Sequence, residues 1–338
     1  GHQYDASGKC SKCSKKFTFT KSDASDWEYT LHETDKTILL KKYIGTKTAL
    51  SIPAKMDVTV DGKKSSYQVV FGGHYEDRVK ASVFASNKKA SIQAVTLESG
   101  VKIDNMDYMF AGCEKLEMVG TIPSTVTSMK GTFKNCSEFC SVAALPTNLT
   151  EISNTFEGCE KIKKVVLLDT IQNISDGTFK DCTEIEEITL PISLNVGNNT
   201  YGTRPALFAN CTNVKKVNFT KGTGIGVNYI TGNGSINCEY YAATPWYYSR
   251  DNEITVTIEE GVTDIGNCMF WSTTGLTKLE LPSTIRTIGS WAFCNCGKWT
   301  SKIDMSKWTV IKNTAFANCS NVTGEFKLSN ELSELGAN

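Results

Sequence analysis

The sequence has little arginine, and its charges of the two signs cancel. Only four of its 36 basic residues are arginines, and 36 acidic residues balance them, so the formal net charge at pH 7 is zero. A nucleic-acid-binding protein needs a basic surface for phosphates, and the planar arginine fork is suited to pairing with them. We therefore expect no nucleic-acid partner.

Histidine is also scarce. The three histidines, His2, His32 and His74, all lie in the first quarter of the chain. The rest of the chain therefore lacks the base of a Ser–His–Asp triad. The paired carboxylates Glu186–Glu187 and Glu259–Glu260 fall on expected strands, where neighbouring side chains point to opposite faces. We expect solvated edges there, no catalytic residues, no cofactor and no enzyme activity.

Long hydrophobic runs are absent. No apolar stretch approaches the roughly 18 residues that a membrane-spanning helix needs, so we expect no membrane insertion. The chain starts at Gly1 without a signal peptide, and we expect that such a segment has been removed.

A phenylalanine recurs along the chain, most often every 23 residues. Five of the eight intervals between nine marker phenylalanines are 23 residues, and the others are 26, 29 and 62. A cysteine follows seven of these markers three residues later. A fixed period of this length indicates a repeat protein. The markers are Phe84, Phe110, Phe133, Phe156, Phe179, Phe208, Phe270, Phe293 and Phe316, and the cysteines are Cys113, Cys136, Cys159, Cys182, Cys211, Cys296 and Cys319.

The residue before each of these cysteines predicts a turn. It is always glycine, asparagine or aspartate, the residues that best tolerate a positive φ. A left-handed residue there would end a short helical turn. We predict one helical or 3₁₀ turn per unit, which contains the phenylalanine and ends at Gly112, Asn135, Gly158, Asp181, Asn210, Asn295 or Asn318.

A strand pattern follows the cysteine. In Ile185–Pro191 and Leu276–Pro282, aliphatic residues alternate with polar ones, and a proline closes the segment. Each repeat of about 23 residues forms one coil, which cannot bury its own apolar face. Neighbouring coils must therefore stack phenylalanine on phenylalanine and cysteine on cysteine. The predicted fold is an α/β leucine-rich-repeat solenoid. It has a concave parallel β-sheet, short helical or 3₁₀ turns on the convex side, and a mostly β N-terminal cap.

Stacking also bears on the state of the cysteines. Equivalent residues of adjacent coils have parallel Cβ vectors, whereas a disulfide needs converging Cβ atoms about 3.8 Å apart. We predict a ladder of buried cysteine thiols that form no disulfide bonds. The alternative is a row of redox-active or metal-binding thiolates.

The N-terminal segment carries one further cysteine pair. His2, Cys10 and Cys13 combine one histidine with a CxxC motif. A structural zinc site needs four ligands, and only three are local. We expect a solvated tail or a staple of the cap. His2, Cys10 and Cys13 as metal ligands are the weaker alternative.

The breaks in the period give the expected organisation. Residues 1–22 form a polar tail with the CxxC, residues 23–82 a β-rich cap of short antiparallel strands, and residues 83–227 a first repeat array. Residues 228–253 are rich in glycine and aromatic residues, and we expect an internal cap or an exposed aromatic insertion. A second array spans 254–338. Its next marker is due just beyond Asn338, so we expect this array to be truncated within a repeat or, as the alternative, to end in a degenerate C-terminal cap.

The repeats resemble a known family. Ile285–Phe293 and Val262–Phe270 are similar to the repeat of BspA-like leucine-rich repeat proteins, in which isoleucine–glycine precedes alanine–phenylalanine and cysteine. The segments Pro245–Val262 and Trp27–Pro53 resemble entry units of such arrays. The resemblance covers residues 27–338, although Asp104–Phe110 and Ile303–Trp308 depart toward a methionine- and tryptophan-bearing variant. It implies a secreted or cell-surface protein of a host-associated bacterium, used in adhesion and protein binding.

Outward positions on the predicted strands are the candidate binding residues. Their charges are mixed, which suits a protein partner with a patterned polar face on a host or neighbouring cell. A glycan that stacks on Trp246, Tyr247 and Tyr248 is the first alternative, and an architectural spacer is the second. The outward positions are Lys164, Glu187, Thr189, Lys216, Asn218, Lys278, Glu280, Lys302, Asp304, Glu325 and Lys327.

Overall fold

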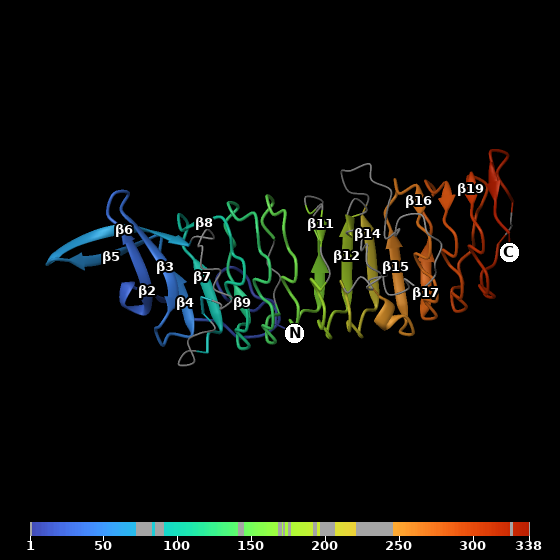
Figure 1. The fold of residues 1–338 in the computed structure, drawn as a ribbon. Helices are drawn as coiled ribbons and strands as arrows, with labels where there is room; N and C mark the ends of the chain where they lie inside the picture. The colour runs from blue at the N-terminus through green and yellow to red at the C-terminus, as the bar shows by residue number, and fades with distance from the viewer. Residues whose placement is uncertain are drawn as a thin grey trace. The chain divides into compact units, whose positions relative to one another are not determined.

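The computed structural model divides the chain into two compact units, residues 1–163 and 164–338, which we describe separately. In Figure 1 the first unit runs from blue to green and the second from green to red. The structure describes residues 2–71, 83–84, 91–140, 145–167, 171, 173–174, 177–191, 195–196, 207–220, 246–324 and 327–337.

The first unit contains two short hairpins. β2 (Trp27–His32) pairs antiparallel with β3 (Thr37–Tyr43), and β5 (Lys55–Val60) pairs antiparallel with β6 (Lys63–Phe71). Parallel pairing of β3 with β6 joins the hairpins, and β8 (Lys102–Ile103) adds to β6. Residues 27–71 therefore contain two antiparallel strand pairs.

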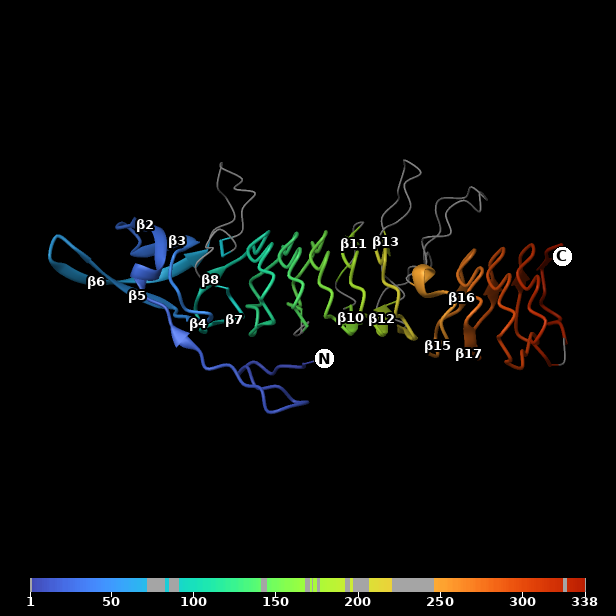
Figure 2. The same cartoon turned by 90° about the horizontal axis from the view of Figure 1, so that it is seen from below.

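A second, parallel sheet of the first unit runs in the order β1-β4-β7-β9. It joins β1 (Thr20–Lys21), β4 (Ala49–Ile52), β7 (Ala94–Leu97) and β9 (Met118–Val119). In Figure 2 the blue N-terminal segment runs up to β4, with which β1 pairs in parallel. The N-terminal segment thus contributes a strand to this sheet.

The second unit is built around a five-stranded parallel sheet. Its order is β10 (Lys164–Val166), β12 (Glu187–Pro191), β14 (Lys216–Thr220), β15 (Ile254–Ile258) and β17 (Leu276–Glu280). Aliphatic side chains alternate inward, so that Ile188, Val217 and Leu279 are fully buried. The predicted strand pattern is confirmed here, including the end of β12 at Pro191.

Shorter strands lie on the other side of these coils. β16 (Asp264–Ile265), β18 (Thr287–Ile288), β19 (Val310–Ile311) and β20 (Glu334–Leu335) form one parallel sheet. β11 (Asn173–Ile174) and β13 (Asn195–Val196) form another. Figure 2 places β16 opposite β15 and β17, so each coil has two flat sides.

The turn that carries the marker phenylalanine is not helical, contrary to the expectation. The helices assigned within the described residues are two 3₁₀ segments outside these turns, η1 (Ala24–Asp26) and η3 (Tyr247–Ser249). In the Phe110 coil, Tyr108 and Gly112 both have positive φ, and the N–H groups of Tyr108, Phe110 and Gly112 donate to the next coil. A helix would direct these N–H groups along its own axis. Hydrogen bonding between coils therefore replaces the helix.

The marker phenylalanines stack within each unit as predicted. Ring centroids of Phe84, Phe110, Phe133 and Phe156 follow one another at 4.8, 5.7 and 5.6 Å. The hairpins of the first unit cover the start of this stack, because Trp27 packs edge-on against Phe84 at 5.6 Å. In the second unit the rings of Phe270, Phe293 and Phe316 stack at 5.1 and 5.3 Å.

The cysteines that follow the markers form no disulfide, and neither do the other five described cysteines. Five of the thiols that follow a marker donate instead to the carbonyl of the marker phenylalanine in the preceding coil. This contact is 3.0 Å from Cys136 to Phe110 and 3.0 Å from Cys296 to Phe270. Burial raises the pKa of Cys136 well above its usual value and that of Cys211 to about 12, which keeps both thiols protonated as donors. The predicted ladder of buried thiols is confirmed for six of these seven cysteines, and Cys319 is partly exposed.

Candidate functional site

The outward face of the five-stranded sheet carries two rows of side chains in register. The first row crosses the sheet as Lys164, Glu187, Lys216, Thr255 and Lys278, one residue from each strand. The second row, two residues further along each strand, is Val166, Thr189, Asn218, Thr257 and Glu280. The parallel register therefore brings seven of the predicted candidates onto one face.

Glu187 organises the middle of this face. Its carboxylate lies 3.3 Å from the Lys164 ammonium and 3.4 Å from that of Lys216, and the Asn218 amide donates to it at 3.0 Å. Burial alone would raise the pKa of Glu187, but these hydrogen bonds and charges outweigh it and hold that pKa below its usual value. The carboxylate is thus ionised at neutral pH and orders its neighbours.

At the β17 edge of the sheet the charged side chains are exposed to solvent. Lys278 and Glu280 are both exposed, and neither forms an ion pair with any described residue. Unpaired charges of opposite sign on adjacent outward positions remain available to a partner.

Three residues of this face were not among the predicted candidates. Thr255 and Thr257 fill the β15 positions, and Val166 contributes an exposed apolar side chain on β10. Their signal was the alternation in Ile254–Ile258 and in Lys164–Val166, which matches that of the neighbouring strands.

Three other candidates lie off the sheet. Lys302 makes only an isolated bridge to Thr323, while Asp304 and Lys327 are exposed on segments without a strand. Glu325 lies outside the described residues. The sheet ends at β17 because the Trp299 indole (3.0 Å) and the Ser301 hydroxyl both donate to the Leu279 carbonyl, which a further strand would need.

Trp246 is not the exposed ring that glycan stacking requires. It is fully buried, stacks on Phe270 at 5.3 Å and donates to the Thr273 hydroxyl at 2.8 Å. Ser249, three residues later, donates to the Cys211 carbonyl at 2.7 Å. The Ser249 N–H donates to the Trp246 carbonyl at 2.8 Å, as each of the seven cysteine N–H groups does to its marker phenylalanine, although the Ser249 hydroxyl bonds a different carbonyl from the cysteine thiols. Trp246 and Ser249 thus take the phenylalanine and cysteine positions of a coil inside the 62-residue interval. Tyr248 is 38% exposed. The side chain of Tyr247 is not among those that the structure describes.

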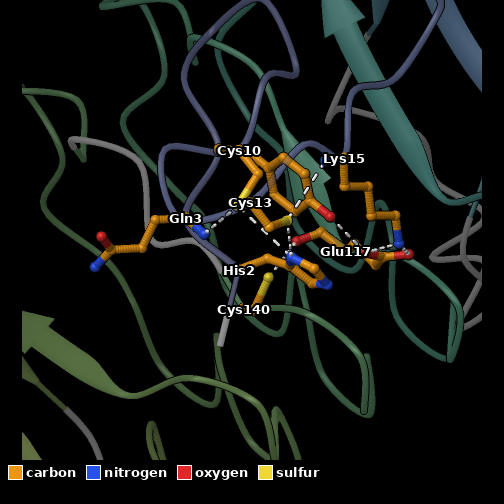
Figure 3. Close-up of polar contacts among 8 residues, drawn as sticks. His2, Gln3, Cys10, Cys13, Lys15, Glu117 and Cys140 are labelled. Carbon is orange, nitrogen blue, oxygen red and sulfur yellow. Dashed lines mark hydrogen bonds and ion pairs between the residues drawn. The ribbon is translucent and has the colours of Figure 1, made fainter.

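A second cluster lies in the N-terminal segment. The ligand atoms of His2, Cys10 and Cys13 all lie within 4.8 Å of one another, although the residues were predicted only as weak metal candidates (Figure 3). Burial would raise the pKa of Cys10, but hydrogen bonds from the Gln3 and Lys12 amides and from His2 outweigh it and lower that pKa to about 6. This environment favours a thiolate.

The N-terminal segment is not a solvated tail. Tyr4, Cys10 and Phe17 are buried against Ala94 and Met118 of the parallel sheet in the first unit. The segment therefore packs on repeat coils beyond residue 83 and also pairs through β1 with β4, whereas the expectation from the sequence was a staple of the cap.

Comparison with known proteins places the chain in a family. The model of the BspA type leucine-rich repeat region matches residues 78–204 and 245–338, in six copies, which is more than half of the chain. The chain belongs to the BspA-type leucine-rich repeat family. This repeat family is generally non-catalytic and suggests a protein-interaction module. The second match in this BspA-type protein starts at residue 245 and so includes the Trp246 coil.

Solved structures similar to this BspA-type protein come from several bacteria. A leucine-rich repeat protein of T. pallidum (TpLRR) is 17% identical, with 83% of this chain and 91% of that chain covered and a TM-score of 0.38. A leucine rich cell surface protein of Faecalibacterium prausnitzii is 15% identical, with 90% and 93% covered and a TM-score of 0.36. The pneumococcal vaccine antigen PcpA is 16% identical, with 94% and 87% covered and a TM-score of 0.37.

No curated protein matches this BspA-type sequence. Among the residues that the structure describes, no helix has the length and apolar character to cross a membrane.

Proposed function

We propose that the chain is a non-catalytic, extracellular or cell-surface interaction module that binds a protein partner through the outward face of the sheet β10-β12-β14-β15-β17. The observation that carries this proposal is the pair of in-register rows on that face, which are polar apart from Val166. Such rows offer a partner a fixed array of charges and hydrogen-bonding groups on a rigid support.

The middle of the face is ordered before binding. Lys164, Lys216 and Asn218 all converge on the Glu187 carboxylate, so a partner does not have to immobilise them. Lys278 and Glu280 supply the exposed charges that select a partner of complementary pattern. Val166 supplies an apolar contact at the opposite edge.

The proposed partner is a protein on a host or neighbouring cell. The mixed signs on the face do not favour a single polyanionic ligand such as nucleic acid. A concave curvature of this sheet would add contact area to a convex partner, as in other repeat solenoids.

The test is a binding screen of the purified chain against immobilised extracellular proteins and glycans. The expected result is a saturable protein hit that weakens at least tenfold in the Lys278→Glu, Glu280→Lys double variant, because charge order at β17 is reversed. Lys102→Asp, Asp104→Lys is the matched control, because these two exposed residues also carry opposite charges two positions apart, belong to the first unit, and can be exchanged without a change in net charge.

Equal affinity of the double variant and the parent would move the site off this face. A hit confined to glycans would favour the glycan-binding alternative instead. No hit at all with folded protein would favour an architectural spacer.

A further inference from the structure

The N-terminal segment is held on the first unit by a small number of contacts. Tyr4 donates to the Glu117 carboxylate at 2.7 Å, and the Lys15 ammonium lies 2.6 Å from the same group. Short bridges link Tyr4 with Cys10 and Lys9 with Lys16, so the CxxC lies in a tight loop. Burial of Tyr4 and Phe17 adds apolar contact to these polar ones, and the thiols of the segment are placed where a cross-link would fix it further.

The loop presents both sulfurs as acceptors. The Cys10 sulfur accepts N–H groups of Gln3 at 3.5 Å and Lys12 at 3.4 Å, and the Cys13 sulfur accepts the Lys15 N–H at 3.4 Å. Amides directed at sulfur stabilise the thiolate, which is the metal-binding form of cysteine. These contacts distinguish this loop from the phenylalanine-linked cysteines, whose thiols donate rather than accept.

His2 faces both sulfurs with the same nitrogen. Its Nδ1 lies 3.5 Å from Cys10 Sγ and 3.2 Å from Cys13 Sγ (Figure 3). One ring nitrogen carries at most one proton, so it cannot satisfy two sulfurs by hydrogen bonding at once. Zn–S bonds of about 2.3 Å and Zn–N bonds of about 2.0–2.1 Å in a tetrahedron would separate nitrogen from sulfur by roughly 3.6 Å. The observed separations are close to that value.

Cys140 lies beside this group. It is out of step with the cysteines that follow the marker phenylalanines, and it packs against the cluster that contains Tyr4 and Cys10. Figure 3 shows the Cys140 side chain beside His2, Cys10 and Cys13, although its sulfur is not part of the group whose ligand atoms all lie within 4.8 Å of one another. Its sulfur makes only a weak 3.5 Å contact to the Glu117 carbonyl, and rotation about χ1 offers it another staggered position.

The geometry points to a structural zinc site formed by His2 Nδ1 and the Cys10, Cys13 and Cys140 sulfurs. Two cysteines and a histidine come from the N-terminal loop, and the third cysteine comes from a repeat coil. The ion therefore cross-links residues 2–22 to the array. Thiolate and imidazole ligands in a tetrahedral arrangement select zinc over magnesium or calcium.

The experiment uses the full chain, kept reduced with a thiol-free reductant and reconstituted with zinc chloride. Elemental analysis after gel filtration is expected to give one zinc per chain. Cys10→Ser and Cys13→Ser are each expected to weaken zinc affinity by roughly tenfold or more. Cys319→Ser is the matched control, because Cys319 follows a marker phenylalanine and makes its contacts elsewhere. It should leave zinc content unchanged.

Cobalt substitution tests the fourth ligand. A tetrahedral cobalt–thiolate spectrum is expected, and its sulfur charge-transfer band should fall by about one third in Cys140→Ser as three thiolates become two. Zinc should also protect residues 2–22 from protease in the parent chain. Circular dichroism checks that each variant is folded.

Reduced, folded protein that retains no zinc would overturn the site. So would full zinc affinity in Cys10→Ser or Cys13→Ser. A zinc-binding Cys140→Ser variant with unchanged affinity and an unchanged cobalt spectrum would overturn the assignment of Cys140 and, with it, the cross-link to the array.

Discussion

Left-handed backbone recurs at two positions around the marker phenylalanine, two residues before it and two residues after it. In the Phe133 coil these are Gly131 (φ 58°) and Asn135 (φ 59°). A left-handed conformation costs an ordinary L-residue roughly 1–2 kcal/mol, and glycine almost nothing. Hydrogen bonds to the next coil from Gly131 and Asn135 N–H groups offset this cost.

Asn135 offers a test of this local cost. Asn135→Gly is expected to change the free energy of unfolding by less than about 0.5 kcal/mol, because glycine adopts the same φ without strain. Asn135→Ala is expected to lower it by about 1 kcal/mol, because alanine does not tolerate φ near 59°. Chemical denaturation of the three proteins gives both values. Equal stability of the alanine and glycine variants would contradict the explanation.

Only one of the two left-handed positions was predictable from the sequence. The residue before each cysteine is glycine, asparagine or aspartate, and it has positive φ in all seven cases. The earlier position is occupied by residues such as Tyr108, Trp291 and Thr314, which give no such signal. There the requirement comes from hydrogen bonding between coils, which no local propensity records. The prediction of a helical turn was wrong for the same reason.

At the scale of the strand, Glu187 couples β10, β12 and β14 on the outward face. Its pKa is lowered, so it binds protons less readily in the folded chain than in the unfolded one. Its contribution to stability is therefore present above the unfolded pKa, near 4.5, and is lost as pH falls through the lower folded value.

Glu187→Gln makes this dependence measurable. The variant is expected to be less stable than the parent by about 1 kcal/mol at pH 7, since the carboxylate is partly exposed and its ion pairs are partly screened. The difference should shrink below pH 4.5 as the parent carboxylate becomes protonated. Glu280→Gln is the control, because Glu280 is exposed and forms no ion pair with any described residue. A difference that persists unchanged at low pH would contradict the electrostatic origin.

Trp246 shows how an element can be hidden by an irregular interval. Its ring lies in the aromatic stack, yet the sequence has tryptophan where the period expects phenylalanine and serine where it expects cysteine. Aromatic density alone favoured an internal cap or an exposed patch. Only the contacts with Phe270 and Cys211 showed that Trp246 and Ser249 take the place of a marker phenylalanine and its cysteine.

Two substitutions of Trp246 separate the packing of its ring from its hydrogen bond to Thr273. Trp246→Ala is expected to lower the free energy of unfolding by about 3–5 kcal/mol, because it empties a fully buried position. Trp246→Phe keeps a ring on Phe270 and loses the hydrogen bond to Thr273, so a loss of about 1–2 kcal/mol is expected. Thermal and denaturant unfolding measure both. Near-wild-type stability of the alanine variant would show that this coil does not contribute to the core.

At the scale of the molecule, periodicity determines which residues share a face but not where a sheet stops. The 23-residue period and the alternation after each cysteine were enough to place Lys164, Glu187, Lys216 and Lys278 on one surface. The same alternation wrongly extended that surface to Lys302. Two side-chain donors on the Leu279 carbonyl ended the ladder, and such non-local competition is absent from any sequence pattern.

Because each coil packs only on its neighbours, substitutions in the second unit should affect each other's free energy of unfolding only when they lie in adjacent coils. In a repeat array, stability is approximately a sum of terms for each coil and each interface between adjacent coils. Phe270 and Phe293 stack at 5.1 Å with nearly parallel rings, so the two Phe→Leu substitutions are expected to be non-additive by about 0.5–1.5 kcal/mol. Phe208 and Phe293 belong to coils separated by two others, and their substitutions should add within about 0.5 kcal/mol. Double-mutant cycles from denaturant unfolding measure both couplings. Equal coupling in the two pairs would mean that the unit behaves as one globular core rather than as stacked coils.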